Sequence, residues 1–360
     1  MNKKIYIDLT CLCDRRWTGI EQFSIKFSST LSQYFKNLRI INIVLRSSKD
    51  KRALPESNYV FLGKNRGRLI TDYLLIPFFL LCYRPEYIVF PAFHPSRISW
   101  LIKPKKTKII TVIHDVVPWH YSNTMSFFAP LLLHRYKYSL KHSYKILTVS
   151  ETERNSLLKL NPGATIKCVY NPISNNIMTG NTSILKRLSL SEKKYILSVS
   201  TIEPRKNINY TLSILYDFIS TRSDLQIVLV GRIGWGKNEI SEIIEVFGSK
   251  IIYTGYISDD DLSTLYKNAL FYISLPIHEG FGRTLIESLL NNTRVVISDI
   301  PVFREIIKSG ALFLPLNDKK TALEILEENV DNLVKSEIDI EYYKQFTENN
   351  YYKLLSNDLF

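Results

Sequence analysis

The chain has 360 residues, of which 45% are hydrophobic and 22% charged, and its formal net charge is +13. A single hydrophobic core stops growing near ~250–300 residues, so this length predicts two domains. The composition is that of a globular protein, which excludes intrinsic disorder, collagen-like repeats and a disulfide-stapled small domain. Its four cysteines (Cys11, Cys13, Cys82, Cys168) are too few and too scattered for a disulfide framework or a zinc cluster, so buried free thiols in a reducing cytosol are expected.

The basic residues are concentrated in the first half of the chain. Residues 1–180 carry 27 Lys and Arg against 10 Asp and Glu, a net charge of +17, whereas residues 181–360 carry 20 against 24, a net charge of −4. This asymmetry predicts that the first half meets a polyanion, either nucleic acid or an anionic membrane surface. No stacking-aromatic RNA motif or helix-turn-helix pattern accompanies the basic residues, which favours the membrane and predicts no nucleic-acid partner.

Two segments bear on membrane contact. The apolar run 73–83 has 11 residues, fewer than the ~18–20 that cross a bilayer, and is expected to form a buried helix. A helix expected over 123–144 mixes apolar residues with Arg135, Lys137, Lys141 and Lys145, which suits docking on an anionic surface. The N-terminus lacks a signal-peptide pattern, so a cytoplasmic protein, peripheral on the inner face of the cell membrane, is expected.

Short apolar strand patterns alternate with helical patterns along most of the chain. The alternation is typical of βαβ units and a parallel sheet covered on both faces. The fold class expected is α/β, with two Rossmann-like doubly wound domains facing across a cleft. The expected strands are 4–9, 39–45, 87–91, 108–114, 145–149 and 166–170, then 195–200, 226–231, 251–256, 271–276, 294–299 and 311–316, with a helix in every gap of the second set except the last.

A polar stretch divides the two sets of strands. Residues 174–193 are expected to form a linker between an N-terminal domain over 1–173 and a C-terminal domain over 194–340. The tyrosine-rich segment 341–360 has apolar residues at helical spacings of three and four. This amphipathic C-terminal helix is expected to pack either on its own domain or back on the first domain.

Several chemistries are disfavoured. No G-x-S-x-G elbow occurs and no cysteine lies in a recognisable pocket motif, so serine or cysteine nucleophiles are not expected. Glycines 231, 234 and 236 do not match the G-x-G-x-x-G dinucleotide fingerprint. Residues 259–261 are three aspartates after Ser258, and they are expected to begin a helix rather than bind metal.

The strongest local signal is a glycine-bearing loop between a strand and a helix. Backbone N–H groups at a helix start can hold a phosphate or a sugar oxygen. Glu279 precedes this helix and Glu287 lies two turns into it, and paired carboxylates suit the vicinal hydroxyls of a sugar. The structural alternative is a capping carboxylate together with a surface glutamate. The loop residues before this helix are Gly280, Phe281 and Gly282.

Three further candidates follow expected strands. Arg205 and Lys206 come after strand 195–200, where two cations could neutralise a diphosphate, although a solvated basic loop is the alternative. Gly19 lies in the loop after the first strand. His114 closes strand 108–114, where a lone histidine is more often structural.

Together these motifs resemble the retaining glycosyltransferases of family four, which have the GT-B fold, and particularly bacterial enzymes of surface-polysaccharide synthesis, many of them mannosyltransferases. The resemblance covers nearly the whole chain. The elements that carry it are TGIEQF at 18–23, IHDVVPWHY at 113–121, STIEPRKN at 200–207, LVGRIGW at 229–235 and HEGFGRTLIE at 278–287. The E-x7-E spacing of Glu279 and Glu287 is the most specific. Ser200-Thr201 stand where many relatives have Gly-Arg, so phosphate binding is expected to depend more on Arg205 and Lys206.

The resemblance implies a role for each candidate. Glu287 would bind the ribose of a nucleotide, Glu279 and the amides of residues 280–282 would hold the donor sugar, and Arg205 and Lys206 would bind the diphosphate. His114 would lie near the reacting carbon, and Gly19 would leave room for donor phosphates or acceptor.

The expected activity is a retaining transfer from a nucleotide-diphosphate sugar to a lipid-linked glycan acceptor, in O-antigen or capsule synthesis. No metal and no other cofactor is expected. A GT-B sugar epimerase or phosphorylase and, from another class, a basic nucleic-acid-binding protein are the alternatives.

Overall fold

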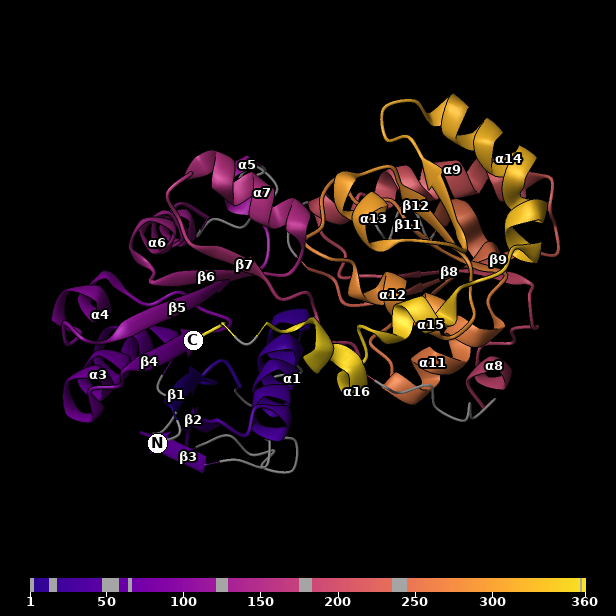
Figure 1. The fold of residues 1–360 in the computed structure, drawn as a ribbon. Coiled ribbons are helices and arrows are strands. Elements are labelled where there is room, and N and C mark those ends of the chain that lie inside the picture. The colour runs from indigo at the N-terminus through magenta and orange to yellow at the C-terminus, as the bar shows by residue number, and fades with distance from the viewer. Residues whose placement is uncertain are drawn as a thin grey trace. The chain divides into compact units, whose positions relative to one another are not determined.

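The computed structural model describes residues 3–12, 18–46, 58–63, 67–120, 129–174, 183–234, 245–356 and 358–360 (Figure 1). The chain divides into two compact units, each with its own parallel sheet. Unit 1 contains the described residues up to His120, those from 129 to Pro172, and Glu348–Phe360. Unit 2 contains the described residues of Ile173–Thr347. Both units are of the α/β class, as the sequence predicts.

Unit 1 is built on a seven-stranded parallel sheet in the order β3-β2-β1-β4-β5-β6-β7. Strand β1 lies in the middle, with Ile5 opposite Ile40 of β2 on one side and Tyr87 of β4 on the other. The strands are β1 (Lys3–Asp8), β2 (Leu38–Leu45), β3 (Asn58–Leu62), β4 (Tyr87–Phe90), β5 (Lys108–Ile113), β6 (Lys145–Thr148) and β7 (Ile166–Cys168). Six of them match expected strands, but β3 was not expected, because this edge strand is short and mostly exposed or half-buried.

Helices cover both faces of this sheet (Figure 1). On one face Phe79 of α3 and Trp100 of α4 pack with Ile88 of β4, and on the other α1 buries Phe23 and Phe27 completely. The helices of unit 1 are α1 (Gly19–Tyr34), α2 (Arg68–Ile70), the π-helix η2 (Thr71–Leu75), α3 (Ile76–Tyr83), α4 (Arg97–Ile102), α5 (Val117–His120), α6 (Ala129–His142), α7 (Glu151–Leu160), α16 (Glu348–Tyr351) and the 3-10 turn η6 (Tyr352–Leu354).

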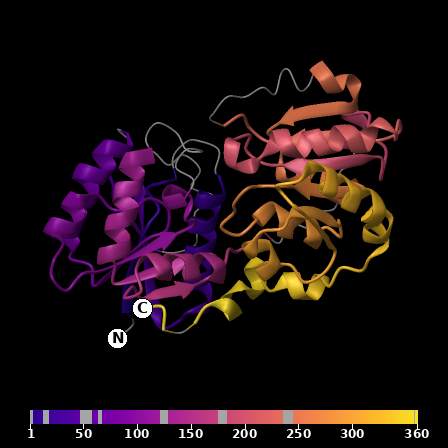
Figure 2. The ribbon, with the colours of Figure 1, turned by 90° about the horizontal axis from the view of Figure 1, so that it is seen from above.

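Unit 2 is built on a six-stranded parallel sheet in the order β10-β9-β8-β11-β12-β13, and Figure 2 shows its layers from above. The strands are β8 (Tyr195–Val199), β9 (Gln226–Val230), β10 (Ile251–Gly255), β11 (Phe271–Ser274), β12 (Val295–Ser298) and β13 (Ala311–Leu314), and all six were expected. The helices are α8 (Ser183–Arg187), η4 (Pro204–Lys206), α9 (Ile208–Ser220), η5 (Gly248–Lys250), α11 (Asp259–Asn268), α12 (Arg283–Leu290), α13 (Pro301–Ile306), α14 (Lys319–Lys335) and α15 (Ile340–Lys344).

One expectation for unit 2 is wrong. The sequence predicted no helix between β12 and β13, but α13 lies there, with Pro301 in its first turn. Its six residues are too few for a visible helical period, yet Val302, Phe303 and Ile306 are buried. Proline at a helix start needs no backbone donor and supplies a helical φ, so the short helix is locally favourable.

The C-terminal segment returns to unit 1, as one of the two expected arrangements had it. Ile173 N–H donates to the Phe346 carbonyl at 2.8 Å where both segments still belong to unit 2. From Glu348 onward the chain packs on unit 1, where Tyr352 stacks on Tyr34 with ring centroids 4.1 Å apart. Residues 341–360 thus comprise α15 in unit 2, and α16 and η6 in unit 1. The described part of the polar stretch, 183–193, belongs to unit 2, and 175–182 lie outside the described residues.

Candidate active site

The sheet of unit 2 has a topological switch point between β8 and β11. From β8 the chain proceeds to β9 and β10 on one side, whereas β11, β12 and β13 extend to the other side. The loops that leave the carboxyl ends of two such strands diverge, and open α/β sheets bind ligands in the crevice between them. Here the Ile277 N–H donates to the Arg205 carbonyl at 3.0 Å, so the loop after β11 is tied to the loop after β8.

Charged side chains from these two loops meet at the switch point. Arg205 Nη1 donates to Glu279 Oε2 at 3.1 Å, and Lys206 Nζ forms an ion pair with Glu279 Oε1. On its other side Arg205 Nη2 donates to Glu203 Oε1 at 2.7 Å. All four side chains are at least four-fifths buried. The structure therefore joins three of the candidate residues and adds Glu203, which belongs to the same sequence motif as Arg205 and Lys206 but had no expected role.

The charges in this cluster change the ionisation of its carboxyl groups. Burial opposes ionisation of Glu279, but the charges of Lys206 and Arg205 outweigh it and lower the pKa of Glu279 to about 2. For Glu203, burial is the larger effect and raises its pKa despite the Arg205 guanidinium. Glu279 is thus ionised at neutral pH. Arg205 is held between two carboxyl groups of different acidity.

The glycine loop before α12 is shaped by its neighbours. Gly282 has φ +91°, and a Cβ there would lie 2.7 Å from Phe303 Cε1, so both the backbone and the available space require glycine. Phe281 is 3% exposed, with its ring 5.3 Å from that of Phe346. Gly280 is buried beside it. The three residues whose amides were expected to face a ligand therefore form a firmly anchored turn at the start of α12.

Glu287 lies on α12, and Arg283, one turn earlier, is its ion-pair partner at 3.5 Å. The side chain of Glu287 is 23% exposed, and Tyr266 lies close by. Burial, then the charge of Glu287, raises the pKa of that tyrosine. The structural alternative for Glu287 was an exposed surface glutamate. Its side chain is instead mostly buried and paired with Arg283.

The loop after β9 packs tightly against the loop after β8. Gly231 has φ +140°, and a Cβ on it would lie 1.8 Å from the Ser200 carbonyl oxygen. A Cβ on Gly234 would lie 2.8 Å from Thr201 Cγ2, and the Gly234 N–H donates to the Ile202 carbonyl at 2.9 Å. These two glycines thus serve the close approach of two loops, and the third, at position 236, lies outside the described residues.

In unit 1 the two sequence candidates lie near the same helix. His114 follows β5 and is 8% exposed, and its Nε2 lies 2.7 Å from the Pro91 carbonyl oxygen. Its ring packs edge-on against Phe23 of α1, with centroids 4.9 Å apart. Gly19 is the first residue of α1, where Thr18 N–H donates to Glu21 Oε2 at 2.9 Å. His114 and the first turns of α1 therefore lie at the carboxyl end of one sheet.

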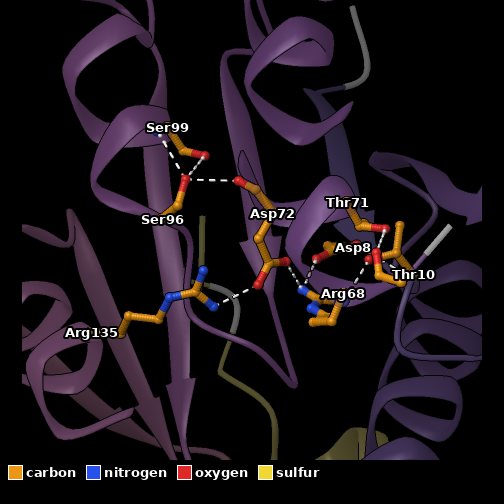
Figure 3. Close-up of polar contacts among 9 residues, drawn as sticks. Asp8, Thr10, Arg68, Thr71, Asp72, Ser96, Ser99 and Arg135 are labelled. Carbon is orange, nitrogen blue, oxygen red and sulfur yellow. Dashed lines mark hydrogen bonds and ion pairs between the residues drawn. The ribbon is translucent and has the colours of Figure 1, made fainter. Parts of the chain in front are cut away.

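Unit 1 also contains a buried ionic cluster that the sequence did not reveal (Figure 3). Asp72 of η2 accepts from Arg68 Nη2 and from Arg135 Nη1, each at 2.5 Å, although its side chain is 3% exposed. Asp8, at the end of β1, lies 3.8 Å from Arg68. Burial raises the pKa of Asp8 in spite of that guanidinium. The members come from segments distant in sequence, so no local motif marks them.

Comparison with known proteins decides the family. Residues 182–353 match the family model described as glycosyl transferases group 1. Arg205, Lys206, Glu279 and Glu287 all lie within that range. Residues 182–353 therefore belong to this family, and the protein is a glycosyltransferase. The family resemblance inferred from the sequence is confirmed.

Relatives of the glycosyltransferase extend the match to both units. It is 28% identical over 336 residues to the O-antigen chain mannosyltransferase RfbU of Salmonella typhimurium, covering 84% of this chain and 85% of that one. It is 26% identical over 333 residues to the O-antigen chain mannosyltransferase B of Escherichia coli, covering 84% of each chain.

Solved structures confirm the GT-B fold of the glycosyltransferase. The Anabaena protein Alr3699/HepE, solved in complex with UDP and glucose, aligns with a TM-score of 0.71 at 13% identity, covering 98% of this chain and 97% of that one. A glycosyltransferase from Rickettsia africae aligns with a TM-score of 0.70 at 17% identity, covering 98% and 96%.

Metal-ligand and thiol candidates can be placed in the described part of the glycosyltransferase. Asp259–Asp261 form the first turn of α11, where Ser258 Oγ accepts from the Asp261 N–H at 3.2 Å, so these aspartates begin a helix as expected. Among the described residues no three His, Cys, Asp or Glu side chains come together as metal ligands. Cys11, Cys82 and Cys168 are free thiols as expected, but only Cys11 is buried, whereas Cys168 is half-buried and Cys82 is exposed at the end of α3. Cys13 lies outside the described residues.

Membrane docking of the glycosyltransferase through the basic helix stays a prediction, although two of its four cations are engaged within unit 1, whereas the expected burial of the run 73–83 is wrong. Residues 123–128 of the expected basic helix lie outside the described residues. Arg135 pairs with buried Asp72, and Lys145, which begins β6, is 7% exposed and donates to the Leu359 carbonyl. The apolar run 73–83 is helical but only partly buried, with Phe78 64% exposed. Within the described ranges no helix combines the length and apolar character that a membrane span requires.

Proposed function

We propose that the enzyme transfers a sugar from a nucleotide-diphosphate sugar to a lipid-linked oligosaccharide acceptor, with retention of configuration, in the synthesis of a bacterial surface polysaccharide such as O-antigen or capsule. The names of the two relatives that span most of this chain support the pathway and make mannose the first sugar to test. Structural neighbours solved with UDP and with UDP-glucose support a nucleotide-sugar donor. The observation that carries the proposal is the convergence of Arg205 and Lys206 on Glu279 at the switch point of unit 2.

The proposed chemistry follows from the charges that develop as the donor reacts. Breaking the bond between the anomeric carbon and the phosphate oxygen leaves a diphosphate with an additional negative charge. Arg205 and Lys206 would stabilise that charge, since preorganised cations in a partly buried site are the main electrostatic contribution to such reactions. Arginine is well suited because its guanidinium can bind phosphate oxygens through two parallel N–H groups.

Glu279 has a second part in the proposal. In this structure its single negative charge is shared between both cations. A donor diphosphate would replace the carboxylate as their counterion, and Glu279 would then accept hydrogen bonds from hydroxyls of the donor sugar. Glu203 keeps its contact with Arg205 Nη2 and would fix the orientation of the guanidinium during this exchange.

Retention is proposed to occur by attack on the same face from which the diphosphate leaves. The acceptor hydroxyl oxygen forms the new bond to the anomeric carbon, the bond to the phosphate oxygen breaks, and the leaving diphosphate takes the hydroxyl proton. This scheme balances without a carboxylate nucleophile, a metal or another cofactor. Glu287 is proposed to bind the nucleotide ribose, and the amides of Gly280, Phe281 and Gly282 the donor sugar.

For unit 1 the roles implied by the family resemblance are retained. His114 is proposed to act near the reacting carbon, and Gly19 to leave room for donor phosphates or acceptor. The charge of +17 on residues 1–180 supports an anionic surface as a partner, here the cytoplasmic face of the inner membrane, where a lipid-linked acceptor would be found.

A panel of nucleotide sugars tests the proposal. Each donor is incubated with the enzyme with and without lipid-linked acceptor, and release of nucleoside diphosphate is measured together with the anomeric configuration of the product by NMR. We expect acceptor-stimulated release from one donor and a product with the donor's configuration. Inversion would overturn the retaining scheme. A product in which an altered sugar remains attached to the nucleotide would identify an epimerase instead.

A further inference from the structure

The helical stretch Arg68–Tyr83, formed by α2, η2 and α3, is apolar on two sides: Ile76, Phe79 and Leu80 are buried in the core, and a second apolar row faces outward. A surface helix of a globular protein normally turns its apolar residues inward and its charged residues toward water. Here Leu74 and Phe78 are 63% and 64% exposed, whereas Asp72 is 3% exposed on the inner side. Leu69 and Leu81 extend the exposed apolar row, at 68% and 48%.

The buried ionic cluster fixes this orientation (Figure 3). Asp72 pairs with Arg68 and with Arg135 of α6, and its backbone carbonyl accepts from Ser96 Oγ at 2.7 Å. Turning the helix to bury its leucines would break both ion pairs and leave buried charges uncompensated, which is strongly unfavourable. The outward position of the apolar row is therefore enforced by the fold.

Helix α4 enlarges the same surface. It packs beside α3 on a shared core, to which α3 contributes Phe79 and α4 contributes Trp100, and Figures 1 and 2 show the two helices side by side. Its outward residues Ile98 and Leu101 are 40% and 77% exposed. We call these six side chains the apolar face: Leu69, Leu74, Phe78, Leu81, Ile98 and Leu101.

Basic residues border one end of the apolar face. Arg84 follows α3, and Lys105 and Lys106 follow α4, and all three are exposed. The two helix ends are held together because Thr107 Oγ1 donates to the Pro85 carbonyl at 2.6 Å. Glu86, two residues after Arg84, contributes one negative charge against these three positive charges. The border is therefore net positive.

We propose that the apolar face docks the enzyme on the surface of an anionic lipid bilayer. The leucines and Phe78 would enter the boundary between headgroups and acyl chains, and the cations beside them would contact lipid phosphates. A large exposed apolar patch marks an interaction site, and the cationic border selects an anionic bilayer as the partner. The inference rests on the proposed function only in taking a membrane as the partner. It assigns docking to the apolar face instead of the basic helix expected over 123–144.

Vesicle co-sedimentation with a matched pair of triple variants tests this proposal. Leu74→Glu/Phe78→Glu/Leu101→Glu adds three negative charges on the apolar face. Leu160→Glu/Tyr216→Glu/Val246→Glu adds the same charge at exposed apolar residues elsewhere, at 40%, 47% and 66% exposure. Vesicles of phosphatidylcholine with phosphatidylglycerol serve as the anionic surface. We expect the first variant to lose binding by ~10-fold or more and the second to bind nearly as the unmodified enzyme does.

Two further measurements separate the outcomes. Both variants should transfer sugar to a water-soluble, delipidated acceptor at the unmodified rate. Loss of vesicle binding with that rate retained supports the docking face, whereas failure of every enzyme form on every donor would count against the proposed function instead. Equal vesicle binding by the two variants overturns the inference. So does an unmodified enzyme that sediments as a dimer in solution while the first variant is monomeric, because a second copy would then cover the apolar face.

Discussion

Lys206 and Glu279 form an ion pair although 73 positions separate them in the chain. Each follows a different strand, β8 or β11, and these strands are neighbours at the point where the sheet of unit 2 changes direction. Arg205 completes the cluster with its own contact to the same carboxylate. Two cations thus share one carboxylate within unit 2, and this trio keeps an excess of one positive charge.

Glu279→Gln should separate nucleotide binding from transfer. The substitution removes the carboxylate that competes with a diphosphate for Arg205 and Lys206, so the nucleoside diphosphate of the active donor should bind at least as tightly as before. Transfer should fall by ~10²–10³-fold, because the charge arrangement around the donor sugar is lost. Calorimetric titration and steady-state kinetics measure the two effects, and a variant with both weaker nucleotide binding and normal turnover would refute this role.

The same variant isolates a pH-dependent contribution to stability. The pKa of Glu279 is lowered from 4.5 to about 2, so its ionised form favours folding by an amount on the order of 3 kcal/mol above pH ~4.5, and this contribution disappears as the pH falls through ~2. The melting temperature of the unmodified enzyme should exceed that of Glu279→Gln by a constant margin between pH 6 and 8. The margin should shrink steadily below pH ~4.5, and a margin that grows on acidification would contradict the assignment.

Lys206→Ala and Glu287→Ala should each abolish transfer without unfolding the protein. Both side chains are part-exposed, at 18% and 23%, and neither belongs to the apolar core. Transfer rates and thermal melting give the two readouts. Glu324→Ala, at a 55% exposed position on α14, is the matched control and should be normal in both. Normal activity in either site variant would remove that residue from the site.

Gly282→Ala should destabilise unit 2 more than an alanine at another glycine with positive φ. At Gly282 the new methyl group would meet Phe303 at 2.7 Å, whereas at Gly248, φ +55°, nothing lies within 4 Å. Both variants carry the backbone cost of about 1 kcal/mol, and overpacking adds ~1–3 kcal/mol at Gly282 alone. Thermal melting should show several degrees between them. Equal melting temperatures would mean that Phe303 moves aside freely.

Chelation should leave the rate of the enzyme unchanged. The proposed scheme uses Arg205 and Lys206, rather than a metal ion, to stabilise the leaving diphosphate. Saturating EDTA is added to an active donor and acceptor pair, and the initial rate is compared with and without added magnesium or manganese. A rate that falls on chelation and returns with either ion would show that the two cations are insufficient.

Local patterns in the sequence were enough to predict most elements of the fold and to name candidate residues for a site. Apolar runs of strand length alternating with helical periods identify parallel strands, because a strand covered on both faces must be apolar almost throughout. Every expected strand is present in one of the two sheets. The two elements that were missed are β3 and α13. The edge strand β3 is mostly exposed or half-buried, and α13 has only six residues, so neither shows a hydrophobic period in the sequence. Glycine-bearing loops after strands likewise indicate ligand positions from the sequence alone.

Only the tertiary structure determined which side chains from distant parts of the chain become neighbours. The pairing of Glu279 with Arg205 and Lys206 depends on β8 and β11 being neighbours, and strand order is a property of the whole sheet. The apolar run 73–83 was expected to be buried because its residues favour burial individually. Only one side of the run is buried, because the ion pairs of Asp72 with Arg68 and Arg135 fix the rotation of the helix. Leaving those charges unpaired inside unit 1 would cost more than exposing the leucines on the other side. Asp72 and Arg135 are far apart in the sequence, so only the folded chain reveals their pairing.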